Sequence, residues 1–135
     1  MTDLSGGCLC GELRYRITAA PESAGYCHCR LCQRSSGAPV LAWASVPAAG
    51  FAWERGAPRE HRSSERGIRE FCAHCGTQIR FRRPGAPRLV DVNLGSLDDP
   101  AAVRPEYHIW TSSRVPWLAL EDGLPRYDGD GPDLD

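Results

Sequence analysis

The segment Gly6-Gly7-Cys8-Leu9-Cys10-Gly11 places two cysteines one residue apart between glycines, and it is the first of three cysteine clusters in the chain. A second cluster, Cys27-His28-Cys29-Arg30-Leu31-Cys32, and a third, Cys72-Ala73-His74-Cys75, contain the other five cysteines. Cysteines one residue apart in an extended chain point to opposite faces, which strains a disulfide between them. Seven is also an odd number, whereas a disulfide framework usually has an even one. Clustered thiolates at this spacing indicate zinc or an iron–sulfur cluster.

The number of thiolates limits the metal sites that the chain can build. Four thiolates close a tetrahedral structural site, whereas three protein ligands with one open position are typical of a catalytic zinc. The first and third clusters together would make a closed site and leave the second cluster as a set of three. Spacing alone also allows Cys29 and Cys32 to pair with the third cluster, so the partition stays open. Seven cysteines cannot form two four-thiolate sites, so a second metal must borrow a histidine or carboxylate or keep an open position. A single closed zinc with three spare thiols is the alternative.

The histidines and tryptophans indicate function less clearly than the cysteines do. His28 and His74 lie inside cysteine clusters, and we expect both to point away from the metal, as residues flanked by ligands usually do. His61 and His108 are expected to be structural or surface residues. The four tryptophans are expected to build the core rather than to line a pocket; they are Trp43, Trp53, Trp110 and Trp117.

Apolar alternation with a period of two predicts a mainly β fold. The chain has 14 glycines and 11 prolines among its 135 residues, which excludes a bundle of long helices. The clearest strands are predicted at 13–17, 78–82 and 89–94, and weaker ones at 40–46, 51–54, 59–64, 68–71 and 107–110. Short helical turns are predicted at 29–35 and 98–103. We expect one domain over residues 1–127 and an acidic C-terminal tail over residues 128–135.

Charge and hydropathy exclude several classes of function. All 16 basic residues are arginines, so lysine Schiff-base chemistry and lysine-dependent phosphate loops are excluded. The net charge of −1 gives no general attraction to nucleic acid or to anionic membranes. No apolar run reaches the roughly 18 residues of a membrane span. The first residues lack the pattern of a signal peptide. We therefore expect a soluble, cytoplasmic protein with no membrane partner.

The order and spacing of the cysteine clusters, with several later motifs, closely resemble the family of glutathione-dependent formaldehyde-activating enzymes, which also includes centromere protein V. The matching segments are Gly7–Gly11, Cys27–Cys32, Ser36-Gly37, Arg69–Thr77, Gly95–Pro100, His108–Trp110 and Trp117–Pro125. Together they cover the chain from about Gly6 to Tyr127.

The resemblance implies a fold of two antiparallel sheets arranged like the sides of a tent, stapled by zinc, with few short helical turns. It implies two zinc ions per chain: a structural zinc held by Cys8, Cys10, Cys72 and Cys75, and a catalytic zinc held by Cys27, Cys29 and Cys32. The implied activity is that of a carbon–sulfur lyase, the reversible addition of glutathione or a similar thiol to formaldehyde or another small aldehyde.

Residues near the second cluster are candidates for supporting roles in that reaction. Gln33, Ser35, Ser36 and the amides around Gly37 could donate hydrogen bonds to a developing alkoxide. Arg30 and Arg34 could attract the carboxylates of glutathione. The alternative function is a zinc-stabilised module that binds protein or nucleic acid without catalysis, supported by Arg80, Arg82, Arg83 and Arg88 near the third cluster. The near-neutral net charge of the chain argues against nucleic acid as the partner of such a module.

Overall fold

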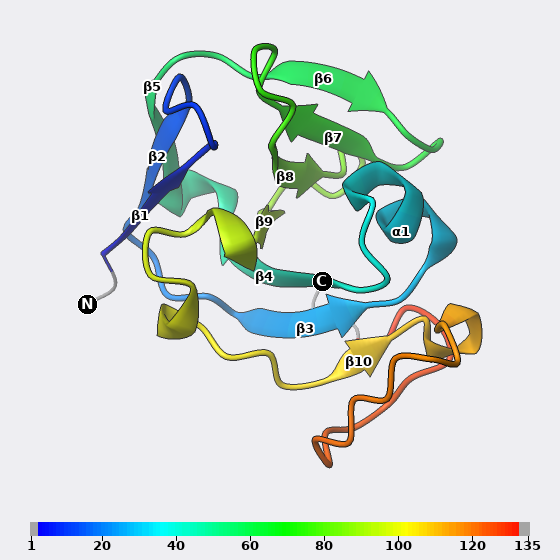
Figure 1. The fold of residues 1–135 in the computed structure, drawn as a ribbon. Coiled ribbons are helices and arrows are strands. Elements are labelled where there is room, and N and C mark those ends of the chain that lie inside the picture. The colour runs from blue at the N-terminus through cyan, green and yellow to red at the C-terminus, as the bar shows by residue number, and fades with distance from the viewer. Residues whose placement is uncertain (1–2, 133–135) are drawn as a thin grey trace.

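The computed structural model describes residues 3–132, which form two β-sheets joined by short turns (Figure 1). The three-stranded sheet has the order β1 (Leu4–Gly7), β2 (Arg14–Ile17) and β5 (Phe51–Arg55). The seven-stranded sheet has the order β10 (His108–Ile109), β3 (Ser23–Cys27), β4 (Leu41–Pro47), β9 (Leu89–Asn93), β8 (Gln78–Arg82), β7 (Ile68–Phe71) and β6 (Arg59–Arg62). Helix α1 spans Arg30–Ser36, and 3-10 turns lie at Ala48–Gly50, Leu94–Ser96, Pro100–Ala102 and Thr111–Ser113. The predicted mainly β fold with two sheets is confirmed.

One strand pair departs from the expected antiparallel arrangement. The paired strands of both sheets run antiparallel except β10, which runs parallel to β3 and aligns His108 with Tyr26. A parallel neighbour needs a long connection. Here the chain between β3 and β10 builds most of the sheet before it returns.

The alternation in β2 shows how the sequence pattern becomes a sheet face. Tyr15 and Ile17 are buried, whereas Arg14 and Arg16 point outward and pair with Asp98 at 2.5 Å and Asp3 at 2.8 Å. Successive side chains of a strand point to opposite faces, so this pattern fixes the register of β2 against its neighbours.

Two strands were missed by sequence pattern. The residues of β1 are Leu-Ser-Gly-Gly, and those of β3 are Ser-Ala-Gly-Tyr-Cys. Small residues of this kind show no apolar alternation and have low strand propensity. Both segments are strands because hydrogen-bonded neighbours surround them: β1 pairs with β2, and β3 lies between β10 and β4.

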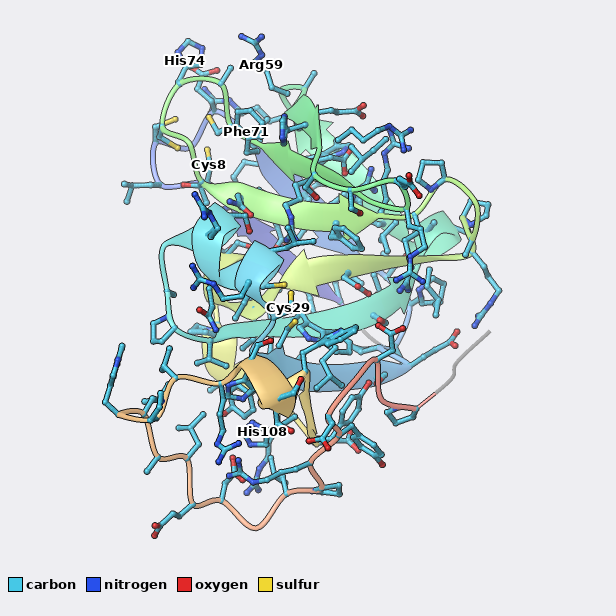
Figure 2. All side chains as sticks on the ribbon, turned by 90° about the vertical axis from the view of Figure 1, so that its right-hand side faces the viewer. Cys8, Cys29, Arg59, Phe71, His74 and His108 are labelled. Atoms are coloured by element: carbon cyan, nitrogen blue, oxygen red, sulfur yellow. The ribbon has the colours of Figure 1, made fainter. Side chains whose placement is uncertain are left out.

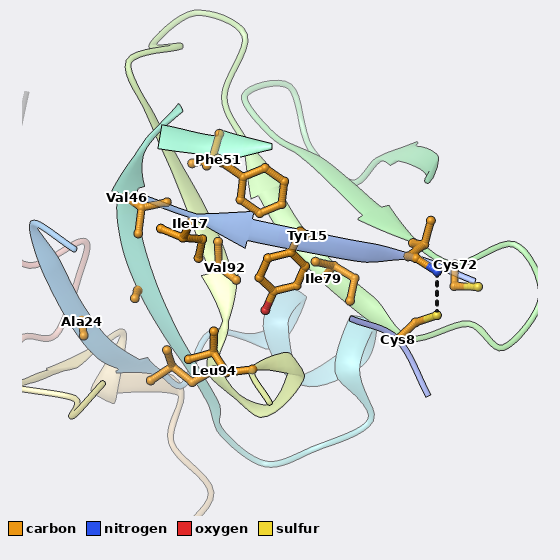
Figure 3. Packing of buried hydrophobic residues seen from close by; sticks show 14 residues of the cluster. Cys8, Tyr15, Ile17, Ala24, Val46, Phe51, Cys72, Ile79, Val92 and Leu94 are labelled. Atoms are coloured by element: carbon orange, nitrogen blue, oxygen red, sulfur yellow. Dashed lines mark hydrogen bonds between the residues drawn. The ribbon is translucent and has the colours of Figure 1, made fainter. Parts of the chain in front are cut away.

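The main core lies between the two sheets (Figure 3). Tyr15, Ile17 and Phe51 reach it from the small sheet, and Val46, Val92 and Ile79 reach it from the large one. Trp43 is buried in a second cluster on the other face of the large sheet. Trp117 is 75% exposed, so the expectation that it belongs to the core is wrong. It follows β10 in an irregular segment that has no sheet to pack against.

A buried hydrogen bond ties the small sheet to the turn after β9. The Tyr15 hydroxyl lies 2.7 Å from Ser96 Oγ, and Ser96 Oγ in turn donates to the carbonyl oxygen of Asn93, so Tyr15 is the donor to Ser96. We expect Tyr15→Phe to lower the free energy of unfolding by about 1 kcal/mol, because it removes one hydrogen bond and leaves the ring in place. Urea unfolding measures this change. Ser96→Ala completes a double-mutant cycle, and strictly additive effects would contradict a direct bond.

The segment after β10 packs back on the strand. Trp110 Nε1 donates to Asp130 Oδ1 at 3.1 Å, and Thr111 Oγ1 donates to Asp128 Oδ1 at 3.2 Å. The first residues of the expected acidic tail thus contact the domain. Residues 133–135 of that tail lie outside the described residues. None of the helices found within residues 3–132 has both the length and the apolar character needed to cross a membrane.

Candidate metal centres

The sulfur atoms of Cys8, Cys10, Cys72 and Cys75 lie within 4.8 Å of one another, in a group we call the four-cysteine site. Cys10 Sγ is 3.6 Å from Cys8 Sγ and 3.7 Å from Cys72 Sγ. A disulfide would need about 2.05 Å. Four sulfurs bound to one zinc at about 2.3 Å stand about 3.8 Å apart at the corners of a tetrahedron. The donor set and its spacing therefore fit a closed zinc site.

Two glycine turns shape the four-cysteine site. Gly11 and Gly76 each follow the second cysteine of a pair and have φ angles of 82° and 79°, which residues with a Cβ adopt only with strain. Each glycine amide donates to the carbonyl oxygen of the first cysteine of its pair, at 3.2 Å for Cys8 and 2.9 Å for Cys72. These turns bring both sulfurs of a pair to the same side of the chain.

The four-cysteine site joins the two sheets at one end. Cys8 and Cys10 lie in the turn between β1 and β2, whereas Cys72 and Cys75 lie in the turn between β7 and β8. The amide of Leu9 also donates to Thr77 Oγ1 at 3.1 Å across the same junction. A metal here would fix a contact between segments more than sixty residues apart in sequence.

The remaining sulfurs, those of Cys27, Cys29 and Cys32, also lie within 4.8 Å of one another, in a group we call the three-cysteine site. Cys27 ends β3, Cys29 is the N-cap of α1, and Cys32 lies in the first turns of that helix. Cys29 Sγ accepts the amide of Cys32 at 3.2 Å. Figure 2 shows Cys29 beside α1, well separated from Cys8 near the loop of His74. Both cysteine groups could hold a metal ion.

The pKa values of the cysteines in the three-cysteine site show that the three thiols influence one another strongly. Hydrogen bonds from the Cys27 and Cys32 thiols lower the pKa of Cys29 to about 2, whereas the same contacts and burial raise the pKa of Cys27 far above its ordinary value. Like charges this close cannot all form without a cation. Three thiolates at this site therefore need a positive charge among them, and a divalent metal supplies it.

The two sites differ in exposure. In the three-cysteine site Cys27 and Cys32 are buried and pack with Trp43 and Tyr107, while Cys29 is half-buried. In the four-cysteine site Cys10 is exposed, and Thr77 lowers the pKa of Cys75 to about 5 through hydrogen bonds from its hydroxyl and its amide. Access to the three-cysteine site is thus from the side of Cys29.

A buried chain of hydrogen bonds supports the loop of the three-cysteine site. His28 Nε2 lies 2.8 Å from His108 Nδ1, and His108 Nε2 lies 2.7 Å from Asp122 Oδ2. Burial and the neighbouring His108 lower the pKa of His28, so its ring is neutral at pH 7. The Asp122 carboxylate accepts a hydrogen bond from His108 Nε2, which orients the His108 ring against His28. The ring nitrogens of His28 are not among the atoms of the three-cysteine group, as expected of a residue between ligands.

The side chains expected to donate hydrogen bonds to an alkoxide donate to backbone carbonyl oxygens instead. Gln33 is buried and donates to the carbonyl oxygens of His28 and Ser113 at 2.7 and 3.0 Å. Ser35 and Ser36 donate to the carbonyl oxygen of Cys32 at 3.2 and 2.6 Å. These side chains hold α1 and the loop of the three-cysteine site in place, because their hydrogen bonds end on backbone groups of that loop and its neighbours.

A cavity of about 240 Å³ lies beside the four-cysteine site. It is lined by Glu12, Leu13, Gly56, Ala57, Cys72, Ala73 and His74. The exposed His74 thus faces this cavity, away from the three-cysteine site. The cavity is therefore no part of the surroundings of the three-cysteine site.

Two side chains that sequence reasoning missed contact the three-cysteine site or its loop. Arg69 Nη2 lies 3.7 Å from Cys32 Sγ, and His108 holds His28. Arg69 stands three positions before Cys72, and His108 is eighty positions from His28. Sequence spacing could not link either residue to the second cluster, since both contacts depend on how distant strands pair.

Comparison with known proteins agrees with this geometry. The family model described as "Glutathione-dependent formaldehyde-activating enzyme" matches residues 3–113, which include all seven cysteines. A protein of Halomonas elongata named "Putative glutathione-dependent formaldehyde-activating enzyme" is 26% identical over 129 residues, covering 87% of this chain and 81% of its own. The crystal structure of a Rhodobacter sphaeroides protein has the same fold, with a TM-score of 0.61 at 19% identity over 91% of this chain and 98% of its own. The chain therefore belongs to the family of glutathione-dependent formaldehyde-activating enzymes.

Proposed function

We propose that the protein is a zinc-dependent carbon–sulfur lyase that reversibly adds glutathione or a similar thiol to formaldehyde or another small aldehyde. The observation that carries this proposal is a group of three cysteine sulfurs within residues 3–132, a set of ligands that would leave one of the four positions around a zinc ion open to substrate. The four-cysteine site has no such position, so we assign it the structural zinc. Membership of the family supports the choice of thiol and aldehyde.

The reaction balances without a further reagent. The thiol sulfur donates an electron pair to the aldehyde carbon, a carbon–sulfur bond forms, and the carbonyl π electrons move to oxygen. The proton lost by the thiol ends on that oxygen, which gives a hydroxymethyl thioether. The reverse reaction breaks the same bond and returns the thiol and the aldehyde. The thiolate is the competent nucleophile, so the site must favour loss of the thiol proton.

The residues of the three-cysteine site suit this task. When bound there, zinc supplies a position at which a thiol is held as its thiolate. Three thiolate ligands leave a formal charge of −1, which makes the site poor at activating water and better suited to a soft sulfur donor. Cys27 and Cys32 are buried, so the protein excludes water on their side. Cys29 is half-buried, and substrate would enter past it.

A matched pair of measurements on the wild-type protein tests the proposal. X-ray absorption at the zinc edge should report an average of about 3.5 sulfur ligands per zinc, rising to about 4 when glutathione is added. Exchange spectroscopy should show interconversion of formaldehyde, glutathione and their adduct faster than in buffer. A protein with two zinc ions whose sulfur coordination and exchange rate do not respond to glutathione or other small thiols would point to a binding module instead.

The arginines that favour a nucleic-acid module are largely neutralised by neighbours. Arg80 and Arg82 pair with Glu70, Arg82 also pairs with Glu60, and Arg88 pairs with Glu22. Such pairs leave little unbalanced positive charge for phosphates, which dominate affinity for nucleic acid. The lyase is therefore the function that we propose.

A further inference from the structure

Arg69 is a buried cation that contacts the three-cysteine site. Its side chain lies on β7, the residue is 7% exposed, and Nη2 is 3.7 Å from Cys32 Sγ. Its Nε donates to Ser63 Oγ at 3.0 Å, and the guanidinium carbon lies 5.0 Å from the centre of the Phe81 ring. A guanidinium keeps its proton in proteins. Burying it without a negative partner is therefore costly.

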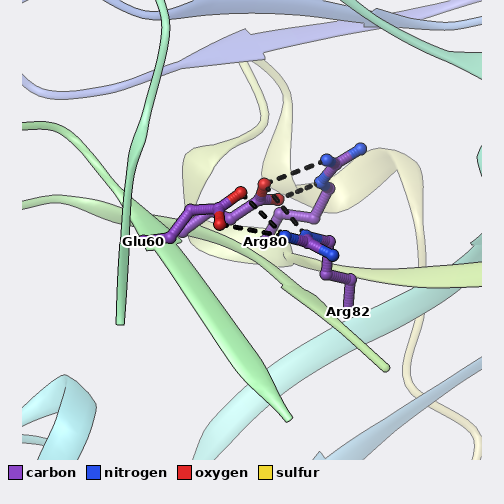
Figure 4. A network of polar contacts seen from close by, with 4 residues as sticks. Glu60, Arg80 and Arg82 are labelled. Atoms are coloured by element: carbon purple, nitrogen blue, oxygen red, sulfur yellow. Dashed lines mark hydrogen bonds and ion pairs between the residues drawn. The ribbon is translucent and has the colours of Figure 1, made fainter. Parts of the chain in front are cut away.

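The carboxylates near Arg69 are engaged elsewhere. Within residues 3–132, no carboxylate oxygen lies within 4.0 Å of its guanidinium nitrogens. Glu70, the next residue, points to the opposite face of β7, where it pairs with Arg80 and, at 3.5 Å, with Arg82 (Figure 4). Asp91, across from Phe81 on β9, accepts a hydrogen bond from Ser45 at 2.5 Å. The group left in contact with Arg69 that would carry a negative charge, as a metal-bound thiolate, is the Cys32 sulfur.

We infer that Arg69 is a positioning residue of the three-cysteine site, where its guanidinium orients the Cys32 sulfur and balances the negative charge of the thiolates. This inference rests on the proposed function in taking the three cysteines as a metal site. Three thiolates around a divalent ion carry −1, and a substrate thiolate in the open position brings the total to −2. The charge of Arg69 brings these values to 0 and −1.

The four-cysteine site has no such need, although four thiolates around a divalent ion also carry −2. Its sulfurs accept backbone amides, that of Leu13 on Cys8 at 3.2 Å and that of His74 on Cys72 at 3.4 Å. Cys10 is exposed, so water screens part of the charge there. None of the three cysteines of the three-cysteine site is exposed, so water screens less of the charge there and the charged side chain of Arg69 compensates. A buried arginine thus supports the site that must accept one more anion.

The test replaces the zinc of the three-cysteine site by cobalt in the full chain. We expect a chelator to remove the zinc of the open three-cysteine site before that of the closed four-cysteine site, and Co²⁺ is added once one zinc per chain has been lost. The sulfur-to-cobalt charge-transfer band and the affinity for Co²⁺ are then measured in wild type and in Arg69→Met. Loss of a group that supports a metal ligand typically costs about 10–100-fold in metal affinity, and we expect a loss of that size. The band should move to longer wavelength, because loss of the hydrogen bond and the charge raises the energy of the sulfur electrons.

A matched control separates positioning from a general loss of stability. Arg80→Met likewise removes an arginine from the seven-stranded sheet. Arg80 is half-buried and lies on the other face of that sheet, against Glu70 and the Phe51 ring. We expect Arg80→Met to destabilise the fold and to leave the cobalt band in place. If both variants shift the band equally, or if neither changes band or affinity, Arg69 has no positioning role. Should Arg69→Met fail to fold, Arg69→Gln decides the matter. It keeps a hydrogen-bond donor without the charge, and wild-type values in it would overturn the inference.

Cys29→Ser distinguishes failure of the inference from failure of the proposed function. If this variant keeps the full cobalt spectrum of the wild type, the three cysteines are not a metal site and the proposed function fails with the inference. If the wild-type band depends on Cys29 but is unchanged in Arg69→Met, the metal site stands and only the role of Arg69 is rejected.

Discussion

Replacing Cys72 by serine is expected to prevent the domain from folding. Cys72 is 1% exposed, and its sulfur is one of the four that join the β1–β2 turn to the β7–β8 turn. Structural zinc sites in small peptides contribute on the order of 10–16 kcal/mol, which is comparable to the whole net stability of a domain. Loss of one thiolate therefore removes most of the free energy that holds the two sheets together. Circular dichroism, solubility and zinc content per chain measure the result.

Two control experiments test whether loss of the zinc, and not the substitution itself, prevents folding. Cys29→Ser, which changes a cysteine of the other site, should remain soluble and folded under the same conditions. A strong chelator should also unfold the wild-type protein, and acid should do so once the thiolates are protonated and release the metal. A soluble Cys72→Ser protein with unchanged melting and two zinc ions per chain would contradict the assignment of a structural zinc to Cys8, Cys10, Cys72 and Cys75.

Replacing Cys29 by serine is expected to abolish turnover of the thiol adduct while the fold is kept. Cys29 is the N-cap of α1 and accepts the amide of Cys32, and serine is a preferred N-cap residue that can keep this hydrogen bond. The hydroxyl is a much poorer ligand for zinc than the thiolate. Metal affinity at this site should therefore fall by more than the roughly 10–100-fold caused by loss of a supporting group. Exchange of formaldehyde and glutathione with their adduct should drop to the spontaneous rate.

The control for this experiment lies on exposed strand β6. His61→Ala should keep the wild-type exchange rate, because His61 is exposed and belongs to neither cysteine site. Zinc content should fall from two ions to one in Cys29→Ser only. Turnover at the wild-type rate in a folded Cys29→Ser protein would show that the reaction does not use the three-cysteine site.

The strands that sequence predicted well are those whose own side chains carry the pattern. The alternation around Tyr15 and Ile17 reports one buried and one exposed face, and it holds wherever the strand lies. By contrast, β1 and β3 consist largely of small residues, and they are strands because neighbouring strands bond to them. Trp117 was misplaced for a related reason: a large apolar side chain is buried only where a sheet or helix stands opposite it.

The mainly β class, the cysteine clusters and the resemblance to a family could be inferred from the order of residues, because apolar alternation predicts strands and close spacing along the chain keeps the thiolates of a cluster together. Which groups from distant parts of the chain come into contact depends on the tertiary structure. It brings Arg69, a near neighbour of Cys72 in sequence, to Cys32 of the other site, and it places His108 against His28. The physical reason is strand pairing: side chains alternate between the two faces of β7, so Glu70 and Arg69 serve opposite sides of one sheet. Which element packs on each side depends on the whole fold.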